Sequence, residues 1–260
     1  PQEDSQFGAL IHEITGKVIE KEIPGLIAVN AVDKAGVHPL LLAVGSERYT
    51  PFNPTKQPQE LLTIANHILG TGQMSLAKYL FICDEDNDLN VNDEKEYFTH
   101  FLERVDWKRD LHFQTKTTID TLDYSGDELN EGSKVVIAAA GEIKRTLSEE
   151  INEINLPDDF LNPKLINKGN LVIEGKGEIN ELIVSLENQR LDGIGLITLV
   201  DNAIFVSENF SNWLWVTFTR SNPANDIYGL HAKTNNKHFS CSLPIIDARI
   251  KPHHAPVLEK

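Results

Sequence analysis

Hydrophobic and polar positions alternate along the chain in blocks that have the lengths of strands and helices. Apolar runs of roughly four to eight residues predict buried strands, whereas apolar positions that recur every three or four residues predict amphipathic helices. The expected extended segments and strands are 17–23, 25–33, 39–44, 78–83, 111–113, 135–140, 171–174, 193–200, 226–230 and 239–247. The expected helices are 58–69, 93–104, 179–189 and 208–219.

Strands that alternate with helices predict an α/β fold with layered, mostly parallel sheets. The polar stretch 114–132 is expected to be a loop. The stretch 148–169 is acidic and rich in Asn and Pro, so we expect it to connect two lobes. We therefore divide the chain into a first lobe of residues 1–147 and a second α/β lobe of residues 148–260.

An internal repeat supports two related strand–helix–strand lobes, because residues 79–113 and 195–229 share a layout. In each copy an arginine closes the helix and an aspartate opens the next strand six residues later. The matched pairs are Arg104 with Arg220, Asp110 with Asp226, Tyr97 with Trp213 and Leu102 with Phe218. A cation suits a helix C-terminus and an aspartate suits a tight turn, so the arginines and aspartates favour a structural role over a catalytic one.

Composition narrows the possible partners. The formal net charge of −15 makes nucleic acid an unfavourable partner, because an acidic surface repels phosphates. No apolar run approaches the roughly 18 residues of a transmembrane segment, and no leader is recognisable, so we expect a cytoplasmic protein. Cys83 and Cys241 are expected to be buried thiols in a reducing compartment. The chain starts at Pro1 and its single methionine is Met74, which indicates a piece of a longer protein.

The stretch CDEDNDLNVNDEKE at residues 83–96 begins like a calcium-binding loop. A glycine and a bidentate glutamate are required at positions where this chain has Leu89 and Lys95, so calcium binding is not expected. We interpret the stretch as a strand-to-helix turn in which Asn92 caps the helix. Asp84 or Asp86 is expected to accept hydrogen bonds from local backbone amides.

The residues alone define no catalytic centre. The glycine pairs at 70–72 and 175–177 complete no phosphate-loop motif, and the nine histidines have no zinc-ligand spacing, so no metal ligand is predicted. A Ser–Lys catalyst at Ser133 and Lys134 would rest on a dipeptide, for which a turn is the simpler interpretation. An oligomerisation or binding module stays open, because Trp213 and Trp215 point to different sides of one helix.

Several stretches together resemble the C-terminal part of UbiD-family decarboxylases. They are IEKEIPGLIAVNAV, AGVHPLLLAV, ILGTGQMSLAKYLFICDEDNDLNVNDEKEYFTHFLERVDWKRDLHF, TTIDTLDYSG and GSKVVIAAAG. The most specific block runs from Leu80 to Asp110, with an acidic turn after an apolar strand and an R-x5-D ending. In the second lobe, NWLWVTFTRSNPANDIYG and LPIIDARIKPHH resemble the extended subgroup associated with menaquinone biosynthesis, whose proposed substrate is a dihydroxynaphthoate.

The resemblance implies a non-oxidative aromatic-acid decarboxylase that carries prenylated FMN with a divalent metal and potassium in its full-length form. In the family the flavin-binding barrel, with its catalytic residues and metal ligands, lies upstream. No segment of this chain matches those motifs, so we carry over no catalytic or metal residue. We expect no cofactor bound to this fragment and no activity from the fragment alone.

The family also implies a role for one loop, which closes over the substrate. The matching residues here are Thr117, Thr118 and Ile119, where the family often has an apolar–Pro–apolar run. Of these three, Ile119 alone keeps the apolar character. The resemblance therefore implies a domain that contributes a substrate-side wall or lid for an aromatic acid and the contacts of a homo-oligomer.

Overall fold

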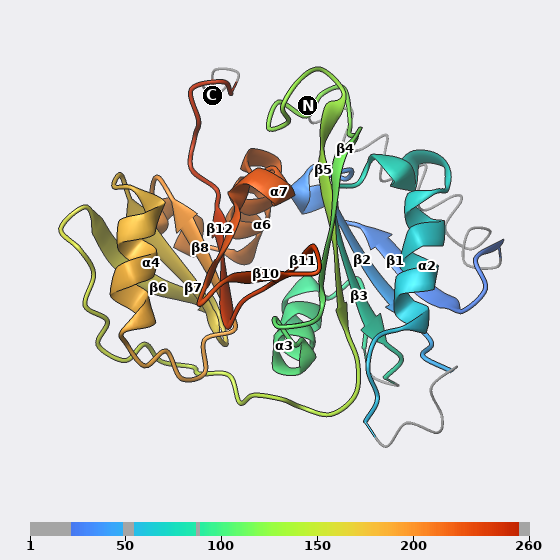
Figure 1. Cartoon of the computed structure of the whole chain (residues 1–260), viewed down its shortest axis with the longest axis horizontal. Helices are drawn as coiled ribbons and strands as arrows, with labels where there is room; N and C mark the ends of the chain where they lie inside the picture. The colour runs from blue at the N-terminus through green and yellow to red at the C-terminus, as the bar shows by residue number, and fades with distance from the viewer. Residues whose placement is uncertain (1–21, 49–54, 87–88, 255–260) are drawn as a thin grey trace.

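The computed structural model describes residues 22–48, 55–86 and 89–254 (Figure 1). Within them, two five-stranded sheets form the framework. The first sheet has the order β1-β2-β3-β5-β4 and the second has the order β6-β7-β8-β12-β9. The strands of the first are β1 (Leu26–Ala31), β2 (Leu40–Gly45), β3 (Tyr79–Asp84), β4 (Leu111–Thr118) and β5 (Glu131–Ala139). Those of the second are β6 (Phe160–Asn167), β7 (Asn170–Gly175), β8 (Leu196–Val200), β9 (Ile227–Leu230) and β12 (Leu243–Asp247).

The two sheets have the same pattern of strand directions. In each, the three central strands are parallel and both edge strands pair antiparallel to their neighbours. The predicted α/β class with two related strand–helix–strand lobes is confirmed. The parallel pairings lie in the centre of each sheet, and a short hairpin of β10 (Lys233–Asn235) and β11 (His238–Ser240) is added outside the repeat.

Helices cover both faces of both sheets. Helix α2 (Glu60–Leu69) packs on the outer face of the first sheet, and α4 (Ile179–Glu187) packs on the outer face of the second. Between the sheets lie α3 (Glu94–Arg104) and α6 (Phe210–Arg220), as Figure 1 shows. The result is five layers, helix–sheet–helix–sheet–helix. The remaining helical turns are η1 (Asp33–Ala35), η2 (Gly72–Leu76), α5 (Ala203–Ser207) and α7 (Pro223–Asp226).

The central layer is an aromatic core shared by both lobes. Phe98 of α3 lies with its ring centroid 5.0 Å from that of Trp213 of α6, at an interplanar angle of 88°. Edge-to-face pairs of this kind add roughly 0.5–1.5 kcal/mol beyond their buried area. The indole of Trp213 donates to Thr198 Oγ1 at 3.0 Å, so its one polar atom is satisfied. Trp213 is fully buried and Trp215 is 44% exposed, which confirms that the two tryptophans point to different sides.

Some boundaries predicted from the sequence are wrong. The predicted connection 148–169 contains β6, an antiparallel edge strand with register shifts around Pro163. Edge strands tolerate proline, and their buried and exposed positions alternate irregularly, so the sequence pattern that predicts such a strand is weak. The predicted loop 114–132 begins later, because β4 continues to Thr118. The predicted helix 208–219 is preceded by a separate helix α5, and the predicted strand 239–247 is divided between β11 and β12.

Two further predictions concern the N-terminal segment and the cysteines. Most of the extended segment predicted at 17–23 lies outside the described residues, and Glu22 is helical. Cys83 and Cys241 are free and buried, as predicted, and burial raises the pKa of each thiol to about 12.

In the part of the chain that the structure describes, no helix combines the length and the apolar character needed to cross a membrane.

Candidate functional site

The end of β4 and its connection to β5 contain the three residues that the family resemblance predicts as a substrate-side loop: Thr117 and Thr118 lie in β4, and Ile119 follows it. Figure 1 shows these two long strands rising above their neighbours, with their connection at the top beside the C-terminal arm. The two strands pair from Leu111 with Ile137 up to Thr118 with Glu131, with one register shift after Gln114. The loop of residues 119–130 is therefore carried at the end of a strand pair that belongs to the first sheet.

The structure places the three predicted loop residues differently from one another. Thr118 is exposed, Thr117 is half-buried and Ile119 is only 1% exposed. The Ile119 side chain occupies the space left by two glycines: a Cβ on Gly126 would lie 2.6 Å from Ile119 Cδ1, and a Cβ on Gly132 would lie 2.8 Å from it. Ile119 is thus an internal anchor of the loop, and Thr118 presents its side chain to solvent.

Lys134 holds the end of β4 in place, at the point where the loop begins. Its side chain is almost fully buried, and Nζ donates to the carbonyl oxygens of Ser75 (2.6 Å), Ala77 (3.2 Å) and Thr118. All three of these acceptors are uncharged backbone groups, so nothing in this set compensates for the lost hydration of the ammonium group. Burial lowers the pKa of Lys134 to about 8.

Charged side chains secure the rest of the loop. The Asp120 carboxylate contacts Nδ1 of His38 and accepts a hydrogen bond from the backbone amide of Leu122 at 2.8 Å. The hydrogen bond with His38 lowers the pKa of Asp120. Asp127 accepts from Lys116 Nζ at 3.1 Å, near the base of the loop. The carboxylates of Asp120 and Asp127 are therefore held by contacts within the protein.

Three large apolar side chains of the loop face solvent, beside exposed polar ones such as Thr121 and Glu128. Leu129 is 78% exposed, Leu122 is 68% exposed and Tyr124 is 39% exposed. Three large apolar side chains on one anchored loop can form a wall against an apolar or aromatic surface. The contribution expected of these apolar side chains is shape and exclusion of water.

The arginine–aspartate pairs of the internal repeat form the same turn in both lobes. Asp110 Oδ2 accepts from the amide of Asp106 at 2.8 Å, and Asp226 Oδ2 accepts from the amide of Asn222 at 2.6 Å. Burial raises the pKa of both aspartates. The matched arginines each reach an acidic side chain after the preceding strand: Arg104 lies 4.0 Å from Asp86, and Arg220 lies 3.2 Å from Asp201. These contacts tie each helix end to its own lobe.

The acidic stretch after β3 is spread over separate contacts. Asp84 accepts from the amide of Glu47, which lies on a neighbouring segment, so the prediction of a local cap is wrong for this residue. The α3 cap is Asp93, which accepts from Glu96 N at 3.1 Å, and the prediction of Asn92 is wrong by one position. Among the described residues, which exclude 87–88, no three His, Cys, Asp or Glu side chains are grouped to hold a metal.

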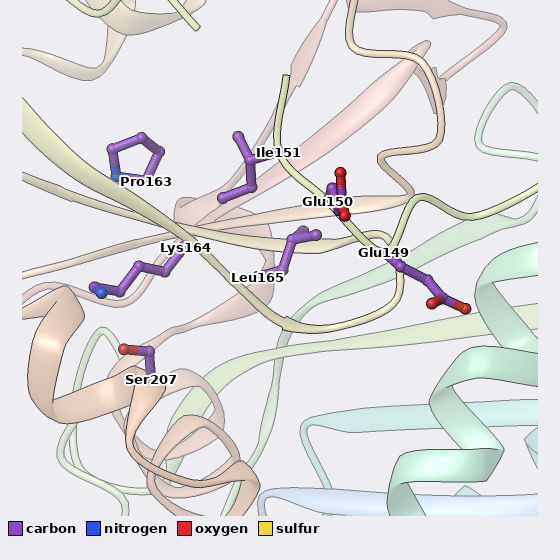
Figure 2. A pocket seen from close by; sticks show the side chains of 7 residues that line it. All are labelled: Glu149, Glu150, Ile151, Pro163, Lys164, Leu165 and Ser207. Carbon is purple, nitrogen blue, oxygen red and sulfur yellow. The ribbon is translucent and has the colours of Figure 1, made fainter. Parts of the chain in front are cut away.

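A shallow depression of about 480 Å3 lies elsewhere, between the segment at 149–151 and β6. Figure 2 shows its lining, in which the charged ends of Lys164 and Glu149 point away from each other. Glu149 is already paired with Lys168 at 2.6 Å. The depression has no converging polar groups, which a specific ligand site needs. The residues that line it are Glu149, Glu150, Ile151, Pro163, Lys164, Leu165 and Ser207.

Lys78 belongs to no sequence motif, and the turn predicted at Ser133 and Lys134 is wrong, because both residues lie in β5. Each of the two lysines stands directly before a run of buried apolar residues, at the start of KYLFIC and near the start of β5. Lys and other charged residues are almost never fully buried unless they are paired. A lysine at the entrance of a buried strand was therefore the available signal for both residues.

Comparison with known proteins defines the class. Residues 5–139 match the family model described as the 3-octaprenyl-4-hydroxybenzoate carboxy-lyase C-terminal domain. Because this match covers more than half of the chain, the chain belongs to the UbiD family and contains its C-terminal domain.

Two relatives from Chlamydia match along nearly the whole chain. A Chlamydia pneumoniae protein described as a subunit of 4-hydroxybenzoate decarboxylase is 32% identical over 267 residues, covering 99% of this chain and 42% of that protein. An uncharacterised Chlamydia trachomatis protein is 30% identical over 259 residues, covering 99% of this chain and 43% of that protein. The chain thus spans less than half the length of these relatives. A solved 3,4-dihydroxybenzoic acid decarboxylase from Klebsiella pneumoniae has a TM-score of 0.43 and 16% identity, over 58% of this chain and 32% of that one.

Proposed function

We propose that this chain is the C-terminal domain of a non-oxidative aromatic-acid decarboxylase, a carboxy-lyase. The observation that carries the proposal is the match of residues 5–139 to the carboxy-lyase C-terminal domain. The Chlamydia pneumoniae relative, described as part of a 4-hydroxybenzoate decarboxylase, gives independent support. The likeness of the second lobe to the menaquinone-associated subgroup makes a dihydroxynaphthoate the substrate that we propose first.

In the proposed full-length enzyme, prenylated FMN with a divalent metal and potassium supplies the electron sink for decarboxylation. The described residues of this chain do not fit that group. They contain no cluster of three metal-ligating side chains, and the two buried lysines near the loop donate to acceptors within the protein. We therefore propose that the flavin, its metal ions and the catalytic residues are held by another part of the full-length protein.

The chain's own contribution would be a substrate-side wall. Leu122, Tyr124 and Leu129 are exposed on a loop that Ile119 anchors from inside, and apolar side chains presented in this way suit contact with an aromatic ring. An apolar wall excludes water from the reacting carboxylate and leaves the chemistry to the cofactor. Thr118, which is exposed at the end of β4, is the polar side chain that we propose to lie nearest to such a substrate.

The test is to co-express the full-length protein with a flavin prenyltransferase and to measure flavin absorbance and CO2 release. Candidate substrates are dihydroxynaphthoates and 4-hydroxybenzoate. We expect both signals from the full-length protein and neither from the isolated chain.

Replacing Leu122 and Leu129 by Ala should raise KM about tenfold, which corresponds to roughly 1.4 kcal/mol of lost contact. Leu161→Ala, at an exposed position of β6, is the matched control. A flavin-loaded protein that decarboxylates no aromatic acid would refute the enzyme proposal.

An oligomerisation module is the second candidate, and the exposed Trp215 favours it. This side chain is 44% exposed on α6. Large exposed aromatic side chains are enriched at protein interfaces. Light scattering on the protein and on a Trp215→Ser variant tests this candidate: a strict monomer in both cases would exclude it.

A further inference from the structure

Lys78 occupies a place where three parts of the molecule meet. It precedes β3, and its side chain is fully buried. Nζ lies 2.7 Å from Asp123 Oδ2, 2.6 Å from Ser125 Oγ and 2.9 Å from the backbone oxygen of Ser221. A lysine ammonium has three N–H donors, so this set satisfies all of them.

These partners belong to two different elements. Asp123 and Ser125 lie in the loop between β4 and β5, which is the proposed substrate-side wall. Ser221 follows α6 in the second lobe. Lys78 therefore connects the loop to the second lobe through one buried cation. Ser221 also lies next to Tyr79, whose hydroxyl is 2.7 Å from Ser221 Oγ.

A second connection joins the same two parts. Asn222 Oδ1 accepts from the backbone amide of Ser133, at the start of β5, at 3.0 Å. On the other side of the loop, Asp127 Oδ1 accepts from Asn225 Nδ2 at 2.7 Å and from Asn222 Nδ2 at 3.4 Å. Ser133 and Asn222 are 2% and 1% exposed, so water cannot readily replace the bond between them, whereas the bond from Asn225 to Asp127 lies at the surface.

The burial of Lys78 makes its connection difficult to break. If the loop moved away, the ammonium would lose Asp123 and Ser125 and remain as an unpaired charge in the interior. Burial lowers the pKa of Lys78, and the Asp123 carboxylate opposes that change. The present loop position is therefore the one that keeps the cation paired, and Ser221 of the second lobe supplies the third acceptor of Lys78 and also accepts from Ser125 Oγ at 3.3 Å.

We propose that Lys78 is a positioning residue through which the second lobe holds the loop between β4 and β5 in place. The significance of this position for substrate binding rests on the proposed function, whereas the connection itself is a property of the chain. The second lobe thus acts on the substrate side without supplying a side chain to the substrate.

Hydrogen exchange on the full-length protein tests the connection. Lys78→Met removes the cation and leaves Asp123 unpaired, so we expect a lower Tm and about tenfold faster exchange in peptides covering residues 119–130. Peptides covering 221–226 should also exchange faster, because the connection works in both directions. Lys176→Met, an exposed lysine in the second lobe, should change neither region.

A double variant separates positioning from stability. Lys78→Met combined with Asp123→Asn removes both charges and keeps the Asp123 Oδ1 position, which accepts from Ser125 N at 2.9 Å. We expect Tm to recover while loop exchange stays fast and the KM for the aromatic acid stays raised by about tenfold. Asp123→Asn alone leaves the buried Lys78 ammonium without its carboxylate, so we expect it to lower Tm and to speed exchange in the loop, as Lys78→Met does.

Two outcomes would overturn the inference. One is unchanged protection of residues 119–130 in Lys78→Met. The other is the return of exchange and KM to wild-type values, together with Tm, in the double variant, since that result would make Lys78 a purely structural residue. If the wild-type protein decarboxylated no acid, the proposed function would fail, and the exchange data would still decide whether Lys78 holds the loop.

Discussion

Two buried lysines near the same loop are accommodated in different ways. Lys78 has a carboxylate among its acceptors, whereas the acceptors of Lys134 are three backbone carbonyls. A carboxylate compensates for lost hydration far better than neutral carbonyls do. Accordingly, burial lowers the pKa of Lys134 to about 8 without any opposing charge.

This difference predicts a stability that depends on pH. The ordinary pKa of a lysine is 10.5, and that of Lys134 in the folded protein is about 8. Between these values the unfolded chain binds a proton that the folded chain does not, so stability rises with pH in this window, whereas below it Lys134 adds no pH dependence. Relative to Lys134→Met, the wild type should gain roughly 1–3 kcal/mol from pH 8 to pH 10.5.

Denaturant unfolding of both proteins at several pH values measures this difference, because the contributions of all other titrating groups cancel between the two proteins. The variant also deprives the carbonyl of Thr118 of a donor, so it should be less stable than the wild type at every pH. Parallel pH profiles for the two proteins would show that Lys134 keeps an ordinary pKa.

At the scale of elements, the N-terminus of α2 is capped by a side chain from a distant segment that follows β2. Its N-cap residue, Gln59, makes no side-chain cap bond. Instead the Glu47 carboxylate, just after β2, accepts from the amides of Gln59 (2.8 Å), Glu60 (3.0 Å) and Leu61 (3.1 Å). A carboxylate at a helix N-terminus is favoured by the helix dipole and satisfies amides that lack intrahelical partners. Glu47 therefore joins β2 to α2.

We expect Glu47→Ala to destabilise the protein by roughly 2–3 kcal/mol, because three charge-assisted hydrogen bonds are lost at a site that is 5% exposed. Asp93→Ala is the comparison, since Asp93 caps α3 through one bond at an exposed position and should cost about 1 kcal/mol. Chemical denaturation of both variants measures the difference. Equal losses would mean that the additional bonds of Glu47 contribute little.

The elements also show what could be predicted from the sequence. Strands that are buried on both faces, such as β3 and β8, have continuous apolar runs and were predicted closely. β6 was missed because it is a half-exposed edge strand that contains Pro163. The contacts of Lys78 could not be predicted, because Ser125 and Ser221 lie 47 and 143 positions away. Long-range pairing leaves no local pattern, so the loop is proposed from the family resemblance, and only the structure shows the side chains that anchor it.

At the scale of the whole molecule, the two sheets share one core. The buried cluster between them draws Phe81 and Phe101 from the first lobe and Trp213 and Phe218 from the second. The boundary that we propose at residues 147 and 148 therefore separates two repeats of the fold. Neither repeat covers the inner face of its own sheet without the other, so we expect the two to be stable only together.

This shared core predicts that both lobes unfold in one cooperative transition. Trp107 of the first lobe, which is 2% exposed, donates from Nε1 to the backbone oxygen of Gly195 in the second at 2.8 Å. Trp107→Phe leaves that oxygen without this donor and opens a gap, so we expect a loss of roughly 1–3 kcal/mol. Hydrogen exchange in increasing denaturant should show the same loss in the free energy of unfolding for peptides from β3 and for peptides from β8. Trp215→Phe, at an exposed position, should change neither. If only the peptides of the first lobe were destabilised, the lobes would be independent units joined by a surface.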